Sequence, residues 1–202
     1  MNAVETFKHD GLTVKIYQDD GACSPAEWDN LGTLVAFSRM WREYRIAERE
    51  STGTEDDAIE RGGFALLARY LRITENATAV PFDFQDYGSG GARLHAGDEG
   101  DDNPSGFIVT SPKRVRELCG DDPQFHAPEW IKDALRGELK VWDQYVEGDV
   151  YGYVIERNGV EVDSLWGLYG FEYAIEEAKS AATFEKSWEE EQVRLIANAM
   201  AL

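Results

Sequence analysis

The sequence is short of the residues from which enclosed chemical sites are most often built. It holds two cysteines, Cys23 and Cys119, and three histidines in 202 residues. Neither cysteine belongs to a C-x-x-C pair, so the chain offers no disulfide framework and no cysteine-based zinc site. Because so little cysteine is typical of a reducing compartment, we expect a cytoplasmic protein.

Long apolar runs and catalytic motifs are missing as well. No stretch approaches the roughly 18 consecutive apolar residues of a membrane-spanning helix, and residues 1–10 lack the apolar core of a signal peptide. We find no phosphate-binding G-x-x-x-x-G-K-[ST] loop, no G-x-S-x-G elbow, no G-x-G-x-x-G after a strand and no H-E-x-x-H pair. We therefore expect no membrane partner, no cofactor and no bound metal.

Basic residues are also scarce. Twenty lysines and arginines stand against 39 acids, which leaves a formal net charge of −19. Such a charge repels phosphate backbones and anionic membrane surfaces, so direct nucleic-acid binding is not expected. It favours a partner with a basic surface, although the acidity can equally serve solubility alone.

The remaining composition is that of a globular protein, with 43% hydrophobic and 12% aromatic residues. We expect residues 1–202 to form one α+β domain, an antiparallel sheet with three or more helices mainly on one face. Leu12, Val14 and Ile16 alternate with polar residues, which is typical of a half-buried strand. The helices expected from apolar spacing are 56–73, with Thr54 as its cap, 128–147 and 171–198.

The clearest local signal is Asn158-Gly159, the usual sequence of a two-residue type I′ turn. It predicts a hairpin over residues 149–166 at the centre of the sheet. The pairs predicted across the turn are Glu156 with Glu161, Ile155 with Val162, Tyr153 with Ser164, and Tyr151 with Trp166. The two opposed glutamates repel each other unless a cation lies nearby.

Residues 86–105 are rich in glycine and aspartate and show no periodicity, so they predict a mobile loop. The acidic run 98–103 within it lacks the spacing of an EF-hand, and a solvated loop is favoured over a calcium site. Pro81, just before this loop, predicts that the strand 77–85 lies at a sheet edge.

The last predicted helix carries many acids. Ala174, Ala178 and Ala182 belong to a first apolar stripe, while Trp188 and Ile196 belong to a second, so a break near residue 183 is conceivable. Like charges at spacings of three and four repel one another, and a cationic partner would relieve that repulsion. The candidate partner-binding residues are Glu172, Glu176, Glu185, Glu189 and Glu190.

A second set of residues supports two alternative functions. Aromatic rings can act as stacking walls for a small ligand or nucleotide, and neighbouring aspartates can hold a divalent metal or carry out acid–base catalysis. The candidate ligand-binding residues are Trp28, Asn30, Asp143, Asp149, Tyr151, Asp163 and Trp166. In a chain with 39 acids, proximity of aspartates also arises by chance.

Three segments together resemble a family of uncharacterised proteins encoded by phages and prophages. They are W-D-N-L-G-T at 28–33, W-D-x-Y-x-x-G-D-V-Y-G-Y at 142–153 and W-G-x-Y-G at 166–170. No activity is established for that family, but the resemblance implies a phage or mobile-element protein in the cytoplasm of a bacterial host, and we expect an accessory protein that binds and inhibits or modulates a host protein. With the acidic charge, it suggests imitation of DNA against a host defence or DNA-handling system.

Overall fold

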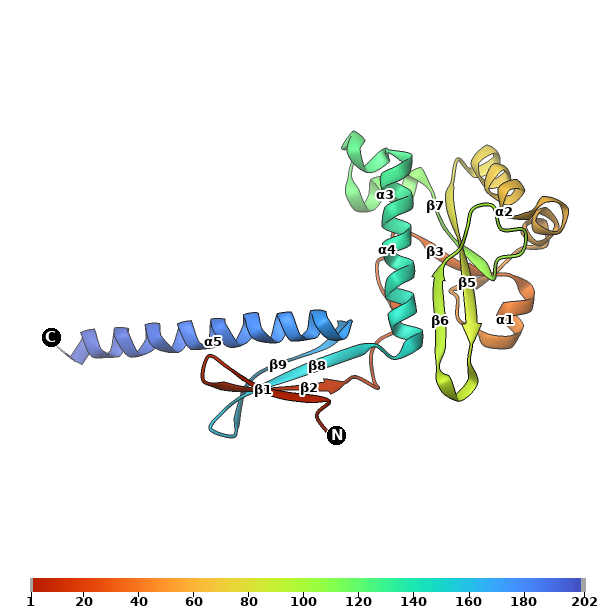
Figure 1. The fold of residues 1–202 in the computed structure, drawn as a ribbon. Coiled ribbons are helices and arrows are strands. Elements are labelled where there is room, and N and C mark those ends of the chain that lie inside the picture. The colour runs from red at the N-terminus through yellow and green to blue at the C-terminus, as the bar shows by residue number, and fades with distance from the viewer. Residues whose placement is uncertain (1, 201–202) are drawn as a thin grey trace. The chain divides into compact units, whose positions relative to one another are not determined.

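The protein is an α+β structure, as the sequence predicts, and the computed structural model describes residues 2–200 (Figure 1). Its strands form two sheets, one of four strands and one of five. The chain divides into two compact units. We call Met1–Cys23 with Gly148–Leu202 the terminal unit, and Ser24–Glu147 the central unit.

This arrangement differs from the one sheet in one domain that the sequence suggests. Apolar alternation indicates which face of a strand is buried, but it does not say which strands pair. Here the strands between residues 33 and 110 pair only with one another, so the 149–166 hairpin belongs to a separate sheet.

The central unit is built on the five-stranded sheet. Its strands are β3 (Thr33–Ala36), β4 (Arg49–Glu50), β5 (Thr78–Asp86), β6 (Ala92–Ala96) and β7 (Gly106–Thr110). Their order is β4-β3-β7-β5-β6, with β3 and β4 parallel and the other neighbours antiparallel. Its helices are α1 (Ser38–Tyr44), α2 (Gly53–Glu75), α3 (Pro112–Cys119) and α4 (Pro128–Glu147), with short 3-10 turns at Pro25–Glu27, Gly88–Gly90 and Pro123–His126.

Helices α2 and α4 lie on opposite faces of this sheet and do not share one face (Figure 1). Successive strand residues point to opposite faces, so Val80 packs with Leu135 of α4, whereas Ala79 packs with Leu67 of α2. The sheet is thus enclosed from both sides, and its strands are correspondingly apolar.

Helix α2 begins earlier than predicted, at Gly53, and its cap is not Thr54. The helix has Thr52 as its cap, because Glu55 stands three residues later and completes a capping box: the Thr52 hydroxyl accepts the Glu55 N–H at 3.3 Å, and the Glu55 carboxylate accepts the Thr52 N–H at 2.6 Å. The acid three positions after Thr54 is Asp57, and its carboxylate lies 3.7 Å from Arg61.

The expected loop 86–105 is only partly irregular. Strand β6 forms within it and pairs with β5 from Phe82↔Ala96 to Asp86↔Ala92. The acidic end of the segment is held on α2, where the Phe64 N–H donates to the Asp101 carbonyl at 3.1 Å. Composition missed β6 because a hairpin strand can be stabilised by its partner strand despite weak periodicity of its own.

The terminal unit contains the four-stranded sheet and one long helix. Its elements are β1 (Glu5–His9), β2 (Leu12–Gln18), β8 (Val150–Arg157), β9 (Val160–Tyr169) and α5 (Phe171–Met200). The strand order is β1-β2-β8-β9, antiparallel throughout. β8 is an inner strand and β9 an edge, so the predicted hairpin is not centred in its sheet.

The Asn158-Gly159 turn forms as predicted, with φ of 53° and 82°. The pair Glu156↔Glu161 also forms, and Lys15 of β2 supplies the cation, with its Nζ 2.5 Å from Glu156 Oε1. Beyond that pair the predicted register is wrong, because two irregularities place extra residues in β9. The observed pairs are Ile155 with Asp163, Tyr153 with Leu165, and Tyr151 with Leu168.

Candidate functional site: the uncovered half of α5

The first half of α5 lies on the four-stranded sheet. Ala174, Ala178 and Ala182 are fully buried at this contact, as the first predicted stripe implies. Alanine carries a single methyl group, so it lets the helix backbone come close to strand residues such as Val14 and Ile155.

The sheet ends before the helix does. The β1–β2 turn makes the last contacts on one side, where Asp10 accepts the Thr183 hydroxyl at 2.7 Å and lies 3.7 Å from Lys186 Nζ. On the hairpin side, Arg157 pairs with Glu189 at 3.1 Å. Helix α5 runs unbroken through residue 183 and on to Met200, beyond these turns (Figure 1).

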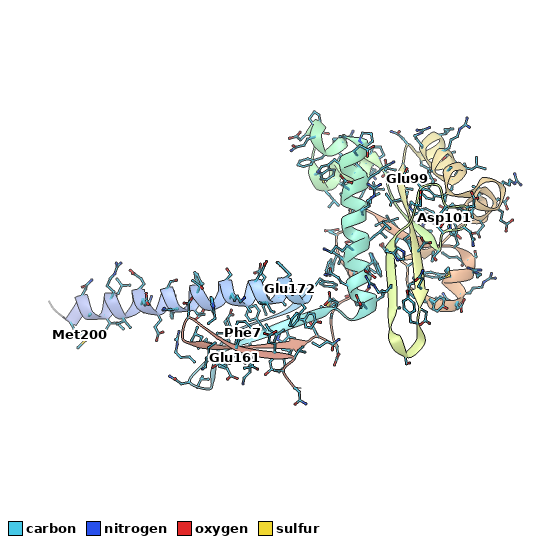
Figure 2. All side chains as sticks on the ribbon, in the orientation of Figure 1. Phe7, Glu99, Asp101, Glu161, Glu172 and Met200 are labelled. Carbon is cyan, nitrogen blue, oxygen red and sulfur yellow. The ribbon has the colours of Figure 1, made fainter. Side chains whose placement is uncertain are left out.

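The second half of α5 therefore exposes large apolar side chains. Their exposed fractions are 65% for Phe184, 54% for Trp188, 61% for Val193, 50% for Leu195, 58% for Ile196 and 83% for Met200. Apart from the two turns that reach Lys186 and Glu189, no described element of the terminal unit covers this half, whose end is marked by Met200 in Figure 2. We call these six residues the apolar face of α5.

The face has two parts. At 3.6 residues per turn, Phe184, Trp188 and Leu195 fall within about 40° of one another, on a side of α5 about 100° around the helix from the buried alanines. Val193, Ile196 and Met200 instead continue the side that carries the buried alanines. The sequence pattern had placed Trp188 with the second group and had not singled out Phe184 or Leu195.

The five candidate glutamates do not share one side of α5. Glu172, Glu176 and Glu190 lie within about 40° of one another, whereas Glu185 and Glu189 lie on the opposite flank of the Phe184–Trp188–Leu195 stripe. The arrangement is an apolar stripe with acids along both edges.

Two of these glutamates already interact within the terminal unit. Glu189 pairs with Arg157. Glu185 contributes to the field around Tyr153, whose pKa lies well above its usual range because of burial, the hydrogen bond to Asp163 and the nearby charges of Glu177 and Glu185. Glu172, Glu176 and Glu190 are exposed and carry the acidic edge most open to a partner.

The alternative ligand-binding residues are divided between the two units. In the central unit, Asp143 is buried beneath Arg93, accepting its Nη2 at 2.7 Å and the Leu94 N–H at 2.8 Å. The Asn30 amide donates to the Pro25 carbonyl at 2.7 Å, and Trp28 is 42% exposed. These contacts give Asp143 and Asn30 structural partners.

In the terminal unit, Tyr151 and Trp166 lie on opposite faces of the sheet and do not form two walls of one site. Tyr151 packs on Phe171 of α5 with ring centroids 5.2 Å apart. Trp166 crosses Gly152 on the open face, 6.0 Å from the Tyr17 ring, and a side chain at Gly152 would collide with it. The β9 irregularities cause this difference.

The aspartates of the enzyme hypothesis have separate roles. Asp163 accepts the Tyr153 hydroxyl at 3.0 Å, and the Asp149 carbonyl accepts the Gly170 N–H at 2.9 Å at the start of α5. Among residues 2–200, no group of three or more His, Cys, Asp or Glu side chains is arranged to hold a metal ion.

Comparisons with known proteins add no relatives. The chain matches no family model and has no significant match among curated proteins or solved structures. Within the described part of the chain, no helix has both the length and the apolar character needed to cross a membrane. The most distinctive feature of the described structure is therefore the long helix α5, whose apolar face is exposed.

Proposed function

We propose that the protein binds another protein by inserting the apolar face of α5 into an apolar groove with a basic rim. The observation that carries this proposal is the exposure of six large apolar side chains, each at least half exposed, on a single helix. A contiguous apolar surface of this kind marks interaction sites more often than it occurs by chance on monomers.

The spacing supports helix-in-groove recognition, in which anchors at intervals of three, four and seven enter one groove. Phe184, Trp188 and Leu195 are separated by four and seven residues. Tryptophan is among the residues most often found at the energetic centre of interfaces, and Trp188 lies at the middle of this stripe.

The charge around the stripe identifies the chemistry of the partner. Helix α5 carries seven glutamates against three basic residues, and the exposed Glu172, Glu176 and Glu190 lie along one side of the stripe. Carboxylates at a rim speed association with a cationic surface and disfavour anionic ones. A partner groove lined by apolar residues and edged by lysine and arginine satisfies both features.

A second copy of the chain is a less suitable partner for the apolar face of α5 than a basic groove on another protein. In a paired coil of two α5 helices with Trp188 and Leu195 in the seam, Glu191 and Asn198 would occupy the alternate seam positions. Burying paired glutamates there is costly, and two chains of formal charge −19 repel each other.

The narrower expectation, an accessory protein of a phage or mobile element that acts on a host DNA-handling or defence protein, fits this partner chemistry and forms part of the proposal. Pure imitation of DNA fits less well, because a phosphate mimic needs only carboxylates and gives no role to the apolar residues. The small-ligand and enzyme alternatives lack a comparable observation.

The test begins by placing a photo-crosslinking amino acid at Phe184 and identifying the captured protein from bacterial lysate. Affinity for the purified partner is then measured by calorimetry for the wild type and for Trp188→Ala. We expect a loss of at least 10-fold, since truncation of a central anchor costs about 2 kcal/mol or more. The control is Ile73→Ala, which removes an apolar side chain from α2 that is more exposed than Trp188, at 69% against 54%.

The role of the acids is measured separately, with all five candidate glutamates replaced by glutamine. We expect a modest loss of affinity that shrinks as salt is added, because rim charges are screened. If Trp188→Ala binds as tightly as the wild type while the glutamine variant loses binding, the carboxylates alone make the interface and the apolar-groove proposal is wrong.

A further inference from the structure

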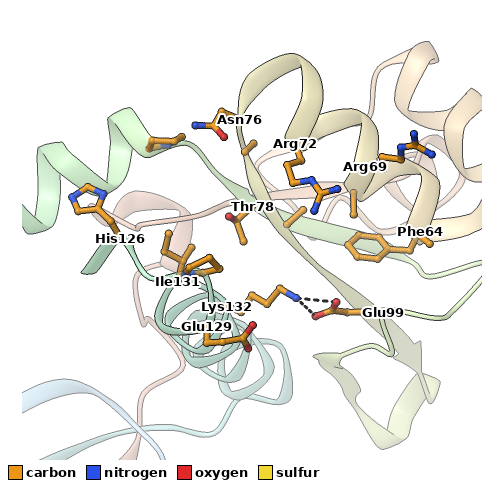
Figure 3. A pocket seen from close by; sticks show the side chains of 16 residues that line it. Phe64, Arg69, Arg72, Asn76, Thr78, Glu99, His126, Glu129, Ile131 and Lys132 are labelled. Atoms are coloured by element: carbon orange, nitrogen blue, oxygen red, sulfur yellow. Dashed lines mark hydrogen bonds and ion pairs between the residues drawn. The ribbon is translucent and has the colours of Figure 1, made fainter. Parts of the chain in front are cut away.

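The central unit contains a cavity between its two long helices. It has a volume of about 610 Å³ and is lined by residues of α2, the start of β5, the loop after β6 and the start of α4. Figure 3 shows Arg72 and Thr78 on one side of it and the ion pair between Lys132 and Glu99 on the other.

At Pro81 the pairing between β5 and β6 ends, beside this cavity. β6 pairs with β5 only as far back as Phe82, and its last backbone bond runs from the Gly97 N–H to the Pro81 carbonyl at 2.9 Å. Pro81 has no N–H to return the bond, so the ladder stops there. The sequence placed Pro81 on an edge strand; β5 is an inner strand that becomes an edge only before Pro81.

The backbone N–H and C=O of Ala79 therefore point toward the cavity. Backbone groups of alternate residues point to the same side of a strand. Because the Pro81 carbonyl points toward β6, the N–H and C=O of Ala79 point the same way, where no β6 residue is paired with them. Ala77 and Ala79 line the cavity with small side chains, and both residues are largely buried, at 5% and 7% exposure.

The walls of the cavity carry three basic side chains, Arg69, Arg72 and Lys132, against two carboxylates, Glu99 and Glu129, which is a slightly positive balance in a protein that is otherwise strongly acidic. Arg69 and Arg72 line it from α2, and neither makes an ion pair or hydrogen bond with any other residue in the range 2–200. Most basic side chains of this chain do have such a partner, for example Lys132 with Glu99 at 2.8 Å. Two neighbouring unpaired guanidinium groups favour a carboxylate ligand.

We propose that this cavity binds an extended acidic peptide segment, which adds to β5 as a short strand. The segment would exchange backbone hydrogen bonds with Ala79, in the position that β6 leaves empty. Since side chains alternate along a strand, one side would meet Arg72 and Ala68 of α2, and the other would meet Ile131 and Lys132 of α4. Backbone bonds supply affinity in strand addition, and the side-chain pockets supply specificity.

The experiment uses the full chain and a fluorescently labelled, end-blocked pentapeptide of alternating glutamate and valine. Binding is followed by anisotropy. We expect saturable binding that weakens at least 10-fold in Arg69→Gln/Arg72→Gln. The control is Arg39→Gln/Lys140→Gln, which removes the same charge from two basic residues outside the cavity lining and should bind like the wild type.

Two further probes separate strand addition from simple ion capture. A peptide of the same sequence with its central amide N-methylated cannot donate a backbone bond from its central residue, and we expect it to bind at least 10-fold more weakly. Glutarate carries the same carboxylates without a peptide backbone and should not compete at equal concentration. Equal binding of the methylated peptide, full competition by glutarate, or no binding of the parent peptide would each overturn the proposal.

Discussion

The two units differ in how the faces of their sheets are covered. In the central unit both faces of the sheet are covered, and large side chains such as Phe82, Leu135 and Trp142 fill the space between layers. In the terminal unit one helix covers one face, and it makes the contact through alanines. This contact stops where the sheet ends, so the second half of α5 stays exposed.

The two units also differ in where their carboxylates lie. The central unit buries the carboxylates of Glu55 and Asp143 against Arg49 and Arg93. The terminal unit keeps its acids on the surface, including the glutamates that flank the apolar face. In the first case the charges stabilise the fold, and in the second they remain at the surface, where the proposed partner would meet them.

We expect the largest difference in stability between two phenylalanine substitutions, one in each unit. Phe82→Ala empties a fully buried position in the central unit and should lower the free energy of unfolding by about 3–5 kcal/mol. Phe184→Ala removes the same atoms from an exposed position in α5 and should change it by about 0.5 kcal/mol or less. Urea unfolding followed by circular dichroism measures both, and equal losses would show that α5 is covered in solution.

An intermediate effect is expected at the Asp143–Arg93 pair. Burial opposes ionisation of Asp143, but the Arg93 guanidinium and the Leu94 N–H outweigh it and hold the pKa of this carboxyl below its ordinary value. Asp143→Asn should cost about 1.5–3 kcal/mol at neutral pH, the range for hydrogen bonds to a charged group.

The same pair predicts a pH dependence. Because the pKa of Asp143 is lower in the folded state, its contribution is complete above the unfolded value of about 3.9 and is lost as pH falls through the folded value. Wild-type stability should therefore drop more steeply below pH 4 than that of Asp143→Asn. Parallel curves for the two proteins would argue against an ionised Asp143 in the folded state.

The smallest of the three effects tests the alanine contact of α5. Ala178→Leu inserts three extra carbons where the helix approaches the sheet and should cost about 1–3 kcal/mol through overpacking. Ala197→Leu adds the same atoms to the exposed half of the helix and serves as the control, with no measurable loss. A tolerated Ala178→Leu would mean that the helix is not closely held even over its first half.

Several local features could be predicted from the sequence because they depend on neighbouring residues. The Asn158-Gly159 turn needs two positive φ angles, and these residues adopt them readily. The repulsion between Glu156 and Glu161 followed from the turn, and Lys15 offsets it. The apolar spacing of α4 and of the first half of α5 identified their buried sides correctly.

Long-range pairing could not be predicted in the same way. Nothing near β6 indicates that its partner is β5, and nothing near Trp166 indicates the irregularities that carry it to the open face of the sheet. The apolar residues 184–200 were equally ambiguous, because a stripe at helical spacing looks the same whether a sheet covers it or ends before it.

The sequence by itself determined the α+β class, the hairpin turn, the helices and the acidic charge, since propensity, spacing and composition act over a few residues. Only the tertiary structure decided which strands share a sheet, where Pro81 leaves the edge of β5 open, and where the cover of α5 stops. Those outcomes depend on the length of one element relative to another and on contacts between residues far apart in the chain, which no local pattern records.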